Sequence, residues 1–168
     1  YRRRVIQLGE DPKRVFNVGA LGVENILNCE LLSREDFYQS IDKDLGDHFA
    51  IVTFHPVTLE EDTAAEQVKE LFAAIEQFPD LSFLFTKSNA DSGGLVVNQE
   101  IDRFVGASSH AYAVTSLGLK RYLSALSLAD MVIGNSSSGI IETPSFGVPT
   151  VNIGNRQKGR IQAANIIN

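Results

Sequence analysis

Cysteine is almost absent from this chain of 168 residues, because Cys29 is the only one. A single cysteine cannot form a disulfide within the chain or build a zinc site from several thiolates. The same scarcity favours a reducing environment, so we expect a cytoplasmic location. His48 and His110 have no acidic or sulfur partners at ligand spacing, so we expect no metal and no resident cofactor.

Positive charge is also scarce, since 15 Lys and Arg stand against 21 Asp and Glu for a net charge of −6. This balance argues against a broad basic surface for nucleic acid or anionic lipid, although it allows a local cationic pocket for one small anion. Long apolar runs are missing too. No run approaches the roughly 18 residues of a membrane span, and no apolar signal region follows the basic start of the chain. We therefore expect no nucleic-acid and no membrane partner.

The composition that remains is that of a globular domain, with 43% apolar and 21% charged residues. Short apolar runs alternate with amphipathic stretches, a pattern typical of parallel strands joined by helices. We predict an α/β fold in which residues 1–168 form a single domain around a Rossmann-like, doubly wound parallel sheet.

The predicted elements follow from this alternation. Residues 1–10 have the pattern of a helix end, and Ser33 caps a helix over 33–45 with Asp36 at the capping-box position. The predicted strands are 14–18, 49–54, 81–85, 112–115, 131–133 and 148–153. The remaining predicted helices begin at Thr58 or Thr63 and end near 78, span 95–105 and 119–128, and run from about 136 to 147.

The segment with the most specific local pattern is Gly-Asn-Ser-Ser-Ser-Gly at 134–139, which lies between a predicted buried strand and a helix. The first N–H groups of a helix lack internal partners and carry the positive end of its dipole, and serine hydroxyls add donors. The three serines, Ser136, Ser137 and Ser138, are therefore candidates to bind a phosphate or diphosphate. The alternative is a plain serine cap on a tight turn.

Other motifs fit this chain poorly. Residues 134–139 contain neither the dinucleotide pattern G-x-G-x-x-G nor the nucleophile elbow G-x-S-x-G. Residues 154–160 differ from a Walker loop because Arg160 stands where lysine is needed and Ile161 where a magnesium-binding hydroxyl is needed. These departures disfavour a serine hydrolase and a P-loop enzyme.

Three further side chains lie at predicted strand ends or in the first turns of the last helix. Glu142 can accept hydrogen bonds from two vicinal hydroxyls such as those of ribose, or it can be a solvated helix residue. His55 can donate to a phosphate oxygen or act as an acid, or it can bond a backbone carbonyl. Arg156 can clamp a phosphate, or it can lie in a solvated basic turn.

Four segments together resemble a known family, namely residues 15–26, 54–62, 86–94 and, most specifically, 134–160. They resemble the C-terminal half of the hydrolysing UDP-N-acetylglucosamine 2-epimerases, which have the glycosyltransferase-B fold. The resemblance covers essentially the whole chain. His-Pro-Val-Thr at 55–58 is similar to the hydrolysing branch rather than the non-hydrolysing one.

The resemblance implies a UDP-sugar substrate in a cleft between two Rossmann-like domains. UDP is eliminated, and water adds to the resulting glycal to give N-acetylmannosamine for sialic-acid-type sugars. The resemblance also implies the residues of the site. His55 would be the catalytic residue near the diphosphate and sugar, with Asn89 and Asp91 near the uracil or sugar. Ser136 and Ser137 would bind the diphosphate, Glu142 would bind the ribose, and Arg156 would assist with the phosphate charge or brace its loop.

One large departure from the family is the missing N-terminal half, which in the family supplies the acidic residues for proton transfer. We therefore expect a fragment of a longer enzyme that turns over nothing alone and binds UDP weakly. Family members commonly pair, so a homo-oligomer is a further expectation. Alternatives are a non-hydrolysing epimerase, the donor-binding half of a glycosyltransferase of the same fold, and a non-catalytic nucleotide-binding module.

Overall fold

A single parallel sheet organises the chain. The structure is a computed structural model that describes residues 1–57, 64–88 and 92–168. The sheet has six strands in the order β3-β2-β1-β4-β5-β6, and every neighbouring pair is parallel. The strands are β1 (Phe49–Thr53), β2 (Ser82–Thr86), β3 (Ala111–Val114), β4 (Met131–Gly134), β5 (Thr150–Asn152) and β6 (Ile166–Ile167).

The order of the strands creates a switch point between β1 and β4. The chain moves outward from β1 through β2 to β3 on one side, then returns to β4 and moves outward to β6 on the other. In open sheets of this type, ligands bind beyond the carboxyl ends of the strands at such a switch point. The predicted doubly wound, Rossmann-like sheet is therefore confirmed.

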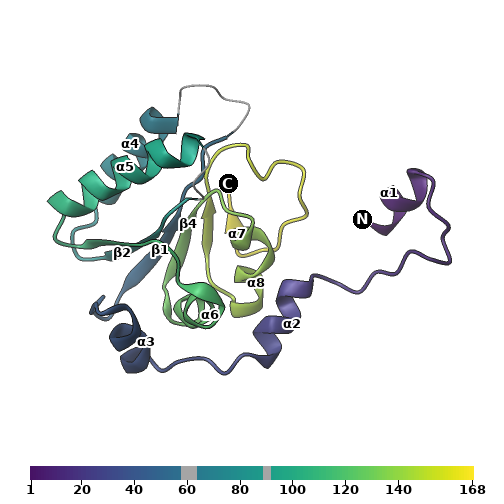
Figure 1. Ribbon diagram of the computed structural model, residues 1–168, viewed down its shortest axis with the longest axis horizontal. Coiled ribbons are helices and arrows are strands. Elements are labelled where there is room, and N and C mark those ends of the chain that lie inside the picture. Colours follow the sequence, from purple (N-terminus) through teal and green to yellow (C-terminus); the bar gives the residue numbers. More distant parts are fainter. Residues whose placement is uncertain (58–63, 89–91) are drawn as a thin grey trace.

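Helices cover both faces of the sheet (Figure 1). The helices are α1 (Arg2–Gln7), α2 (Leu21–Asn28), α3 (Arg34–Ile41), α4 (Ala64–Ile75), α5 (Ser92–Ala107), α6 (Gly118–Leu128), α7 (Ser138–Ile141) and α8 (Thr143–Phe146). The apolar side chains of α4 and α5 pack on one face with Val52 and Phe85, while those of α3 and α6 pack on the other with Ile51 and Leu84. Burial on both faces explains why β1 is apolar at nearly every position and buried throughout.

Two predicted helix signals are confirmed in detail. Ser33 is the N-cap of α3, and its hydroxyl accepts a hydrogen bond from the backbone N–H of Asp36 at 3.1 Å. The apolar residues that recur at helical spacing in α4, Val68, Leu71, Phe72 and Ile75, are all buried. The predicted starts of this helix, at Thr58 or Thr63, lie outside the described residues.

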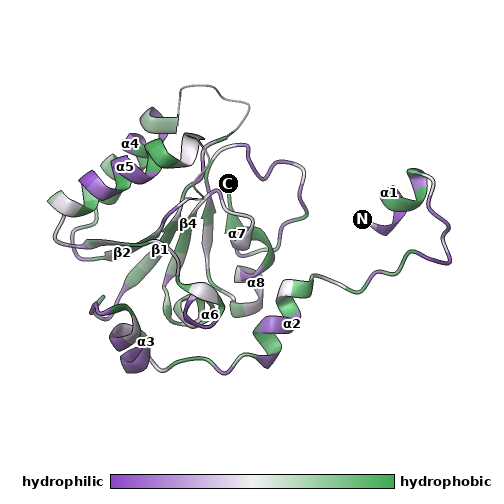
Figure 2. Cartoon of the chain, viewed as in Figure 1, coloured by the Kyte–Doolittle hydropathy of each residue, from purple (hydrophilic) through white to green (hydrophobic). Residues whose placement is uncertain are grey.

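The strand predicted at residues 14–18 is wrong. These residues belong to an N-terminal arm that stretches away from the body of the molecule (Figures 1 and 2). The arm begins with α1, which corresponds to the helical segment predicted over residues 1–10. Phe16 and Val18 are 78% and 77% exposed. A strand needs a neighbouring strand for its backbone hydrogen bonds, and the described sheet places none beside this segment.

Residues 138–146 form two short helices rather than the one continuous helix predicted. The break falls at Glu142, which ends α7 and caps α8. Pro144 lies in the first turn of α8, where its missing N–H costs nothing because that group has no helical partner. The short strand β6 was not predicted, because only two of its residues pair with β5.

No helix in the described parts of the chain combines the length and the apolar character that a bilayer crossing requires.

Candidate functional site

The carboxyl ends of β1 and β4 are joined by one side chain at the switch point. Asn135 follows β4 directly and is 1% exposed. Its Oδ1 accepts from the backbone N–H of His55 at 2.8 Å, and its Nδ2 donates to the carbonyl oxygen of His55 at 2.7 Å. The amide thus satisfies both backbone groups of His55 where the β-ladder ends. The loops after β1 and β4 are held together by this pairing.

Gly134 makes the close approach of these two strands possible. Its φ is +138°, a backbone conformation that side chains disfavour, and a Cβ there would lie 1.9 Å from the carbonyl oxygen of Thr53. Asn135 N–H donates to that same oxygen at 3.1 Å. Only glycine therefore allows the chain to leave β4 in the direction that begins the following loop.

The serine loop, residues 134–139, runs from β4 into α7. Ser137 is the N-cap of α7, and the hydroxyl of Ser136 accepts from the backbone N–H of Ser138 at 3.4 Å. Ser136 and Ser137 are half-buried at the carboxyl edge of the sheet. Hydroxyls and backbone N–H groups at this edge can donate hydrogen bonds to an anion.

His55 has a fixed ring orientation. Its Nδ1 lies 2.9 Å from the hydroxyl of Ser88, which follows β2. Ser88 is itself held by Asn98 of α5, whose amide accepts from the Ser88 backbone N–H at 2.8 Å and donates to its carbonyl oxygen at 3.0 Å. The Ser88 contact therefore brings the end of β2 to the same edge as the ends of β1 and β4.

Arg156 lies against the serine loop from the segment after β5. Its Nη1 donates to the backbone carbonyl of Asn135 at 3.1 Å, and the buried Gln157 donates to the same oxygen at 2.8 Å. Bracing the loop was one of the two roles expected for Arg156. Gln157 was not singled out from the sequence, where it lies beside the more conspicuous arginine.

Glu142 is linked to α6 through Ser138. The Ser138 hydroxyl donates to Glu142 Oε2 at 2.6 Å, and the Tyr122 hydroxyl contacts Ser138 Oγ in a short hydrogen bond. On the other side, a Cβ added to Gly22 at the start of α2 would lie 3.3 Å from Glu142 Oε1. Tyr122 was missed in the sequence, because a tyrosine inside a helix of apolar character carries no motif.

The environment of Tyr122 keeps its phenol neutral. Burial raises the pKa of Tyr122 to about 12, and the nearby Glu142 charge acts in the same direction. Tyr122 is therefore a hydrogen-bond donor throughout the neutral pH range.

The structure brings most of the predicted site residues to one edge. His55 and Arg156 are hydrogen-bonded to Asn135, Ser136 and Ser137 follow Asn135 in the serine loop, and Glu142 lies at the end of α7. Asn89 and Asp91 lie outside the described residues. No group of three His, Cys, Asp or Glu within the described ranges could hold a metal ion.

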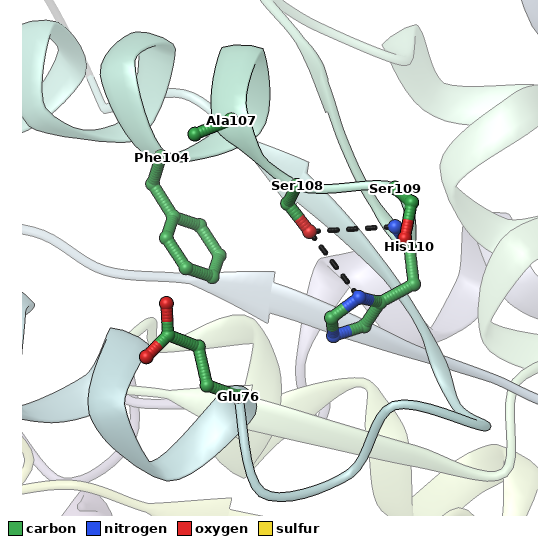
Figure 3. Close-up of a pocket in the computed structure, with 6 residues that line it drawn as sticks. All are labelled: Glu76, Phe104, Ala107, Ser108, Ser109 and His110. Atoms are coloured by element: carbon green, nitrogen blue, oxygen red, sulfur yellow. Dashed lines mark hydrogen bonds between the residues drawn. The ribbon is translucent and has the colours of Figure 1, made fainter.

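A separate pocket lies at the opposite end of the sheet. It has a volume of about 200 Å³ and is lined by Glu76, Phe104, Ala107, Ser108, Ser109 and His110 (Figure 3). His110 directly precedes β3, and its Nδ1 lies 3.3 Å from the Ser108 hydroxyl. This pocket therefore shares none of the loops that follow the carboxyl ends of the strands.

Comparisons with known proteins agree with this architecture. A hydrolysing GDP/UDP-N,N′-diacetylbacillosamine 2-epimerase of Campylobacter jejuni is 40% identical over 99% of this chain, which spans 44% of that relative. The polysialic acid biosynthesis protein P7 of Escherichia coli is 40% identical over 99% of this chain, which spans 42% of its length. The MnaA–UDP co-structure from S. aureus has the same fold, with a TM-score of 0.68 at 14% identity over 94% of this chain and 42% of that one.

This chain thus spans less than half the length of the curated relatives that it matches. The family model for UDP-N-acetylglucosamine 2-epimerase matches it from residue 1 to residue 168. The chain belongs to the UDP-N-acetylglucosamine 2-epimerase family.

Proposed function

We propose that this chain is the UDP-binding half of a hydrolysing UDP-N-acetylglucosamine 2-epimerase. The observation that carries the proposal is the position of the serine loop, which begins α7 at the switch point directly beside His55. The 40% identity to a hydrolysing 2-epimerase over nearly the whole chain supports the hydrolysing reaction over the non-hydrolysing one.

The proposed reaction consumes one water. A base removes the proton from C2 of the sugar, the C1–O bond breaks, and UDP leaves with the bonding electrons, which gives a glycal. Water then adds across the double bond, with its hydroxyl on C1 and a proton on C2, and releases N-acetylmannosamine. Because UDP leaves as an anion, donors aimed at its phosphates lower the barrier to elimination.

The residues at the edge of the sheet fit the parts of UDP. Ser136 and Ser137 would bind the diphosphate with hydroxyls and backbone N–H groups, and Glu142 would accept from the ribose hydroxyls. His55 would lie near the diphosphate and sugar as the catalytic residue of this half, with its ring held by Ser88. Arg156 would brace the serine loop through Asn135 and add positive charge near the phosphates.

Asn89 and Asp91, which belong to this half, stay predicted contacts of the uracil or sugar. The carboxylates that transfer protons would come from the second half that the longer relatives possess, so the chain alone should turn over nothing. A cytoplasmic location and a homo-oligomer stay predictions. The sugar is UDP-N-acetylglucosamine or a modified relative with two acetamido groups, in keeping with the name of the C. jejuni protein.

Calorimetric titration with UDP tests the binding role of this half. We expect weak saturable binding, and Ser137→Ala should weaken it by roughly 10- to 100-fold, the worth of a hydrogen bond to a charged group. The control is Ser127→Ala, since Ser127 is exposed and donates only locally to the Ser124 carbonyl at 2.8 Å. Equal affinities in the two variants, or release of N-acetylmannosamine from UDP-N-acetylglucosamine by the chain alone, would contradict the proposal.

A further inference from the structure

We propose that Tyr122 is a positioning residue, which fixes the proton of Ser138 and thereby orients the Glu142 carboxylate toward the hydroxyls of a bound ribose. Tyr122 lies on α6, a helix whose role in the fold is otherwise to pack against the sheet. The ribose part of this inference rests on the proposed function, whereas the orientation of Glu142 can be tested without any ligand.

The direction of the hydrogen bonds follows from counting protons. Ser138 Oγ lies 2.6 Å from Glu142 Oε2, and an ionised carboxylate can only accept, so the single Ser138 proton points to Glu142. Ser138 can then only accept in its short contact with Tyr122, which makes the phenol the donor. The chain of bonds therefore runs one way, from Tyr122 through Ser138 to Glu142.

The direction of these hydrogen bonds fixes the orientation of the Ser138 hydroxyl. A serine hydroxyl rotates among several staggered positions when nothing selects one. The Tyr122 proton occupies one lone pair of Ser138 Oγ, which leaves the Ser138 proton aimed at Glu142. Because Tyr122 belongs to a helix packed in the core, it supplies a fixed reference for a carboxylate at the site edge.

The same bonds determine which of the three serine hydroxyls can donate to a phosphate. The Ser138 proton is committed to Glu142, so Ser136 and Ser137 are the hydroxyls left to donate to a phosphate. The first carboxylate oxygen of Glu142, Oε1, faces Gly22 of α2, where a Cβ would lie 3.3 Å away. Glu142 is therefore held on one side by α6 through Ser138 and bounded on the other by α2.

The test compares three ligands that differ in what Glu142 can touch, namely UDP, 2′,3′-dideoxy-UDP and inorganic diphosphate. In the unmodified chain UDP should bind about tenfold tighter than the dideoxy form, the worth of a hydrogen bond to a charged group. Tyr122→Phe should reduce this ratio to about twofold and leave the affinity for inorganic diphosphate within about twofold. Tyr112→Phe is the matched control, because its exposed hydroxyl contacts only the Ser109 carbonyl, at 3.4 Å.

Two results would overturn the proposal. Tyr122→Phe would weaken all three ligands equally if Tyr122 were only structural, or it would leave the ratio at the unmodified value if Glu142 needed no positioning. Should Tyr122→Phe fail to fold, Ser138→Ala breaks the same chain of bonds at its middle and must give the same loss of ratio.

A structure of the ligand-free Tyr122→Phe variant separates this inference from the proposed function. We expect Glu142 to leave its position on Ser138 or to occupy more than one rotamer, and an unchanged carboxylate would refute the positioning role. If the unmodified chain showed no UDP binding at all, the proposed function would fail, while the structure of the variant would still decide whether Tyr122 orients Glu142.

Discussion

Asn135 and His55 form a two-way amide pair across the switch point, with Oδ1 accepting from the His55 N–H at 2.8 Å and Nδ2 donating to the His55 carbonyl at 2.7 Å. The pair replaces the β-ladder at the place where β1 and β4 stop. The backbone carbonyl of Asn135 meanwhile receives Arg156 and Gln157. One residue therefore links three segments that are far apart in the sequence.

Removal of this amide should destabilise the fold. Asn135→Ala leaves the N–H and the carbonyl of His55 without their partner, and each unsatisfied backbone group costs about 1–3 kcal/mol when it is shielded from water. We expect the free energy of unfolding in urea to fall by roughly 2–4 kcal/mol. Asn155→Ala, at an exposed position of the same edge, should change it by less than about 0.5 kcal/mol. Equal effects of the two substitutions would contradict the linking role of Asn135.

Gly134 should tolerate no side chain. A Cβ 1.9 Å from the Thr53 carbonyl oxygen forces β1 and β4 apart, and a φ of +138° adds backbone strain. Gly134→Ala should cost more than about 4 kcal/mol or abolish folding, as measured by urea unfolding. Gly106→Ala is the control, since Gly106 lies in α5 with open space around its Cα, and it should stabilise by about 0.5–1 kcal/mol. Similar stabilities of the two variants would contradict the claim that a side chain at position 134 collides with β1.

Tyr122 should make the fold sensitive to high pH. Its pKa is raised from 10.0 in the unfolded chain to about 12 in the folded one, so the unfolded state loses its proton first. The stabilisation is fully present below pH 10 and falls by about 2–3 kcal/mol as the pH rises to 12. Burial also raises the pKa of Tyr38, which adds a loss of the same sign.

A comparison with Tyr122→Phe isolates the contribution of Tyr122, because Tyr38 titrates in both proteins. The difference in free energy of unfolding between the two proteins should shrink by about 2 kcal/mol between pH 9.5 and 12. A difference that stays constant across this range would mean that Tyr122 ionises as easily in the folded state as in the unfolded one.

Patterns that depend on neighbours in the sequence predicted most of the fold. The apolar run of β1, the Ser33 cap and the inward face of α4 each reflect a local rule, and each agrees with the structure. The strand predicted at 14–18 failed because strand formation depends on a partner that the local sequence does not contain. The last predicted helix is interrupted at Glu142, because a new helix begins at Thr143 with Pro144 in its first turn.

In the candidate site, too, residues with a local sequence signal could be predicted and residues that act through distant contacts could not. The serine loop and His55 could be singled out because their residue types follow predicted strands, whose carboxyl ends meet at one edge. Asn135, Tyr122 and Gln157 act through contacts with residues 16 to 80 positions away, for which the sequence carries no local signal. These long-range contacts determine how the serine loop and Glu142 are held.

A two-dimensional NMR titration of the ¹⁵N-labelled chain with UDP tests the central claim most directly. Binding of the diphosphate at the serine loop predicts saturable shifts that are largest for the backbone amides of Ser136, Ser137 and Ser138, with smaller shifts at Glu142. Inorganic diphosphate should shift the serine amides and spare Glu142. Saturable shifts confined to the Figure 3 pocket around His110, or no saturable shift in the serine loop, would contradict the account.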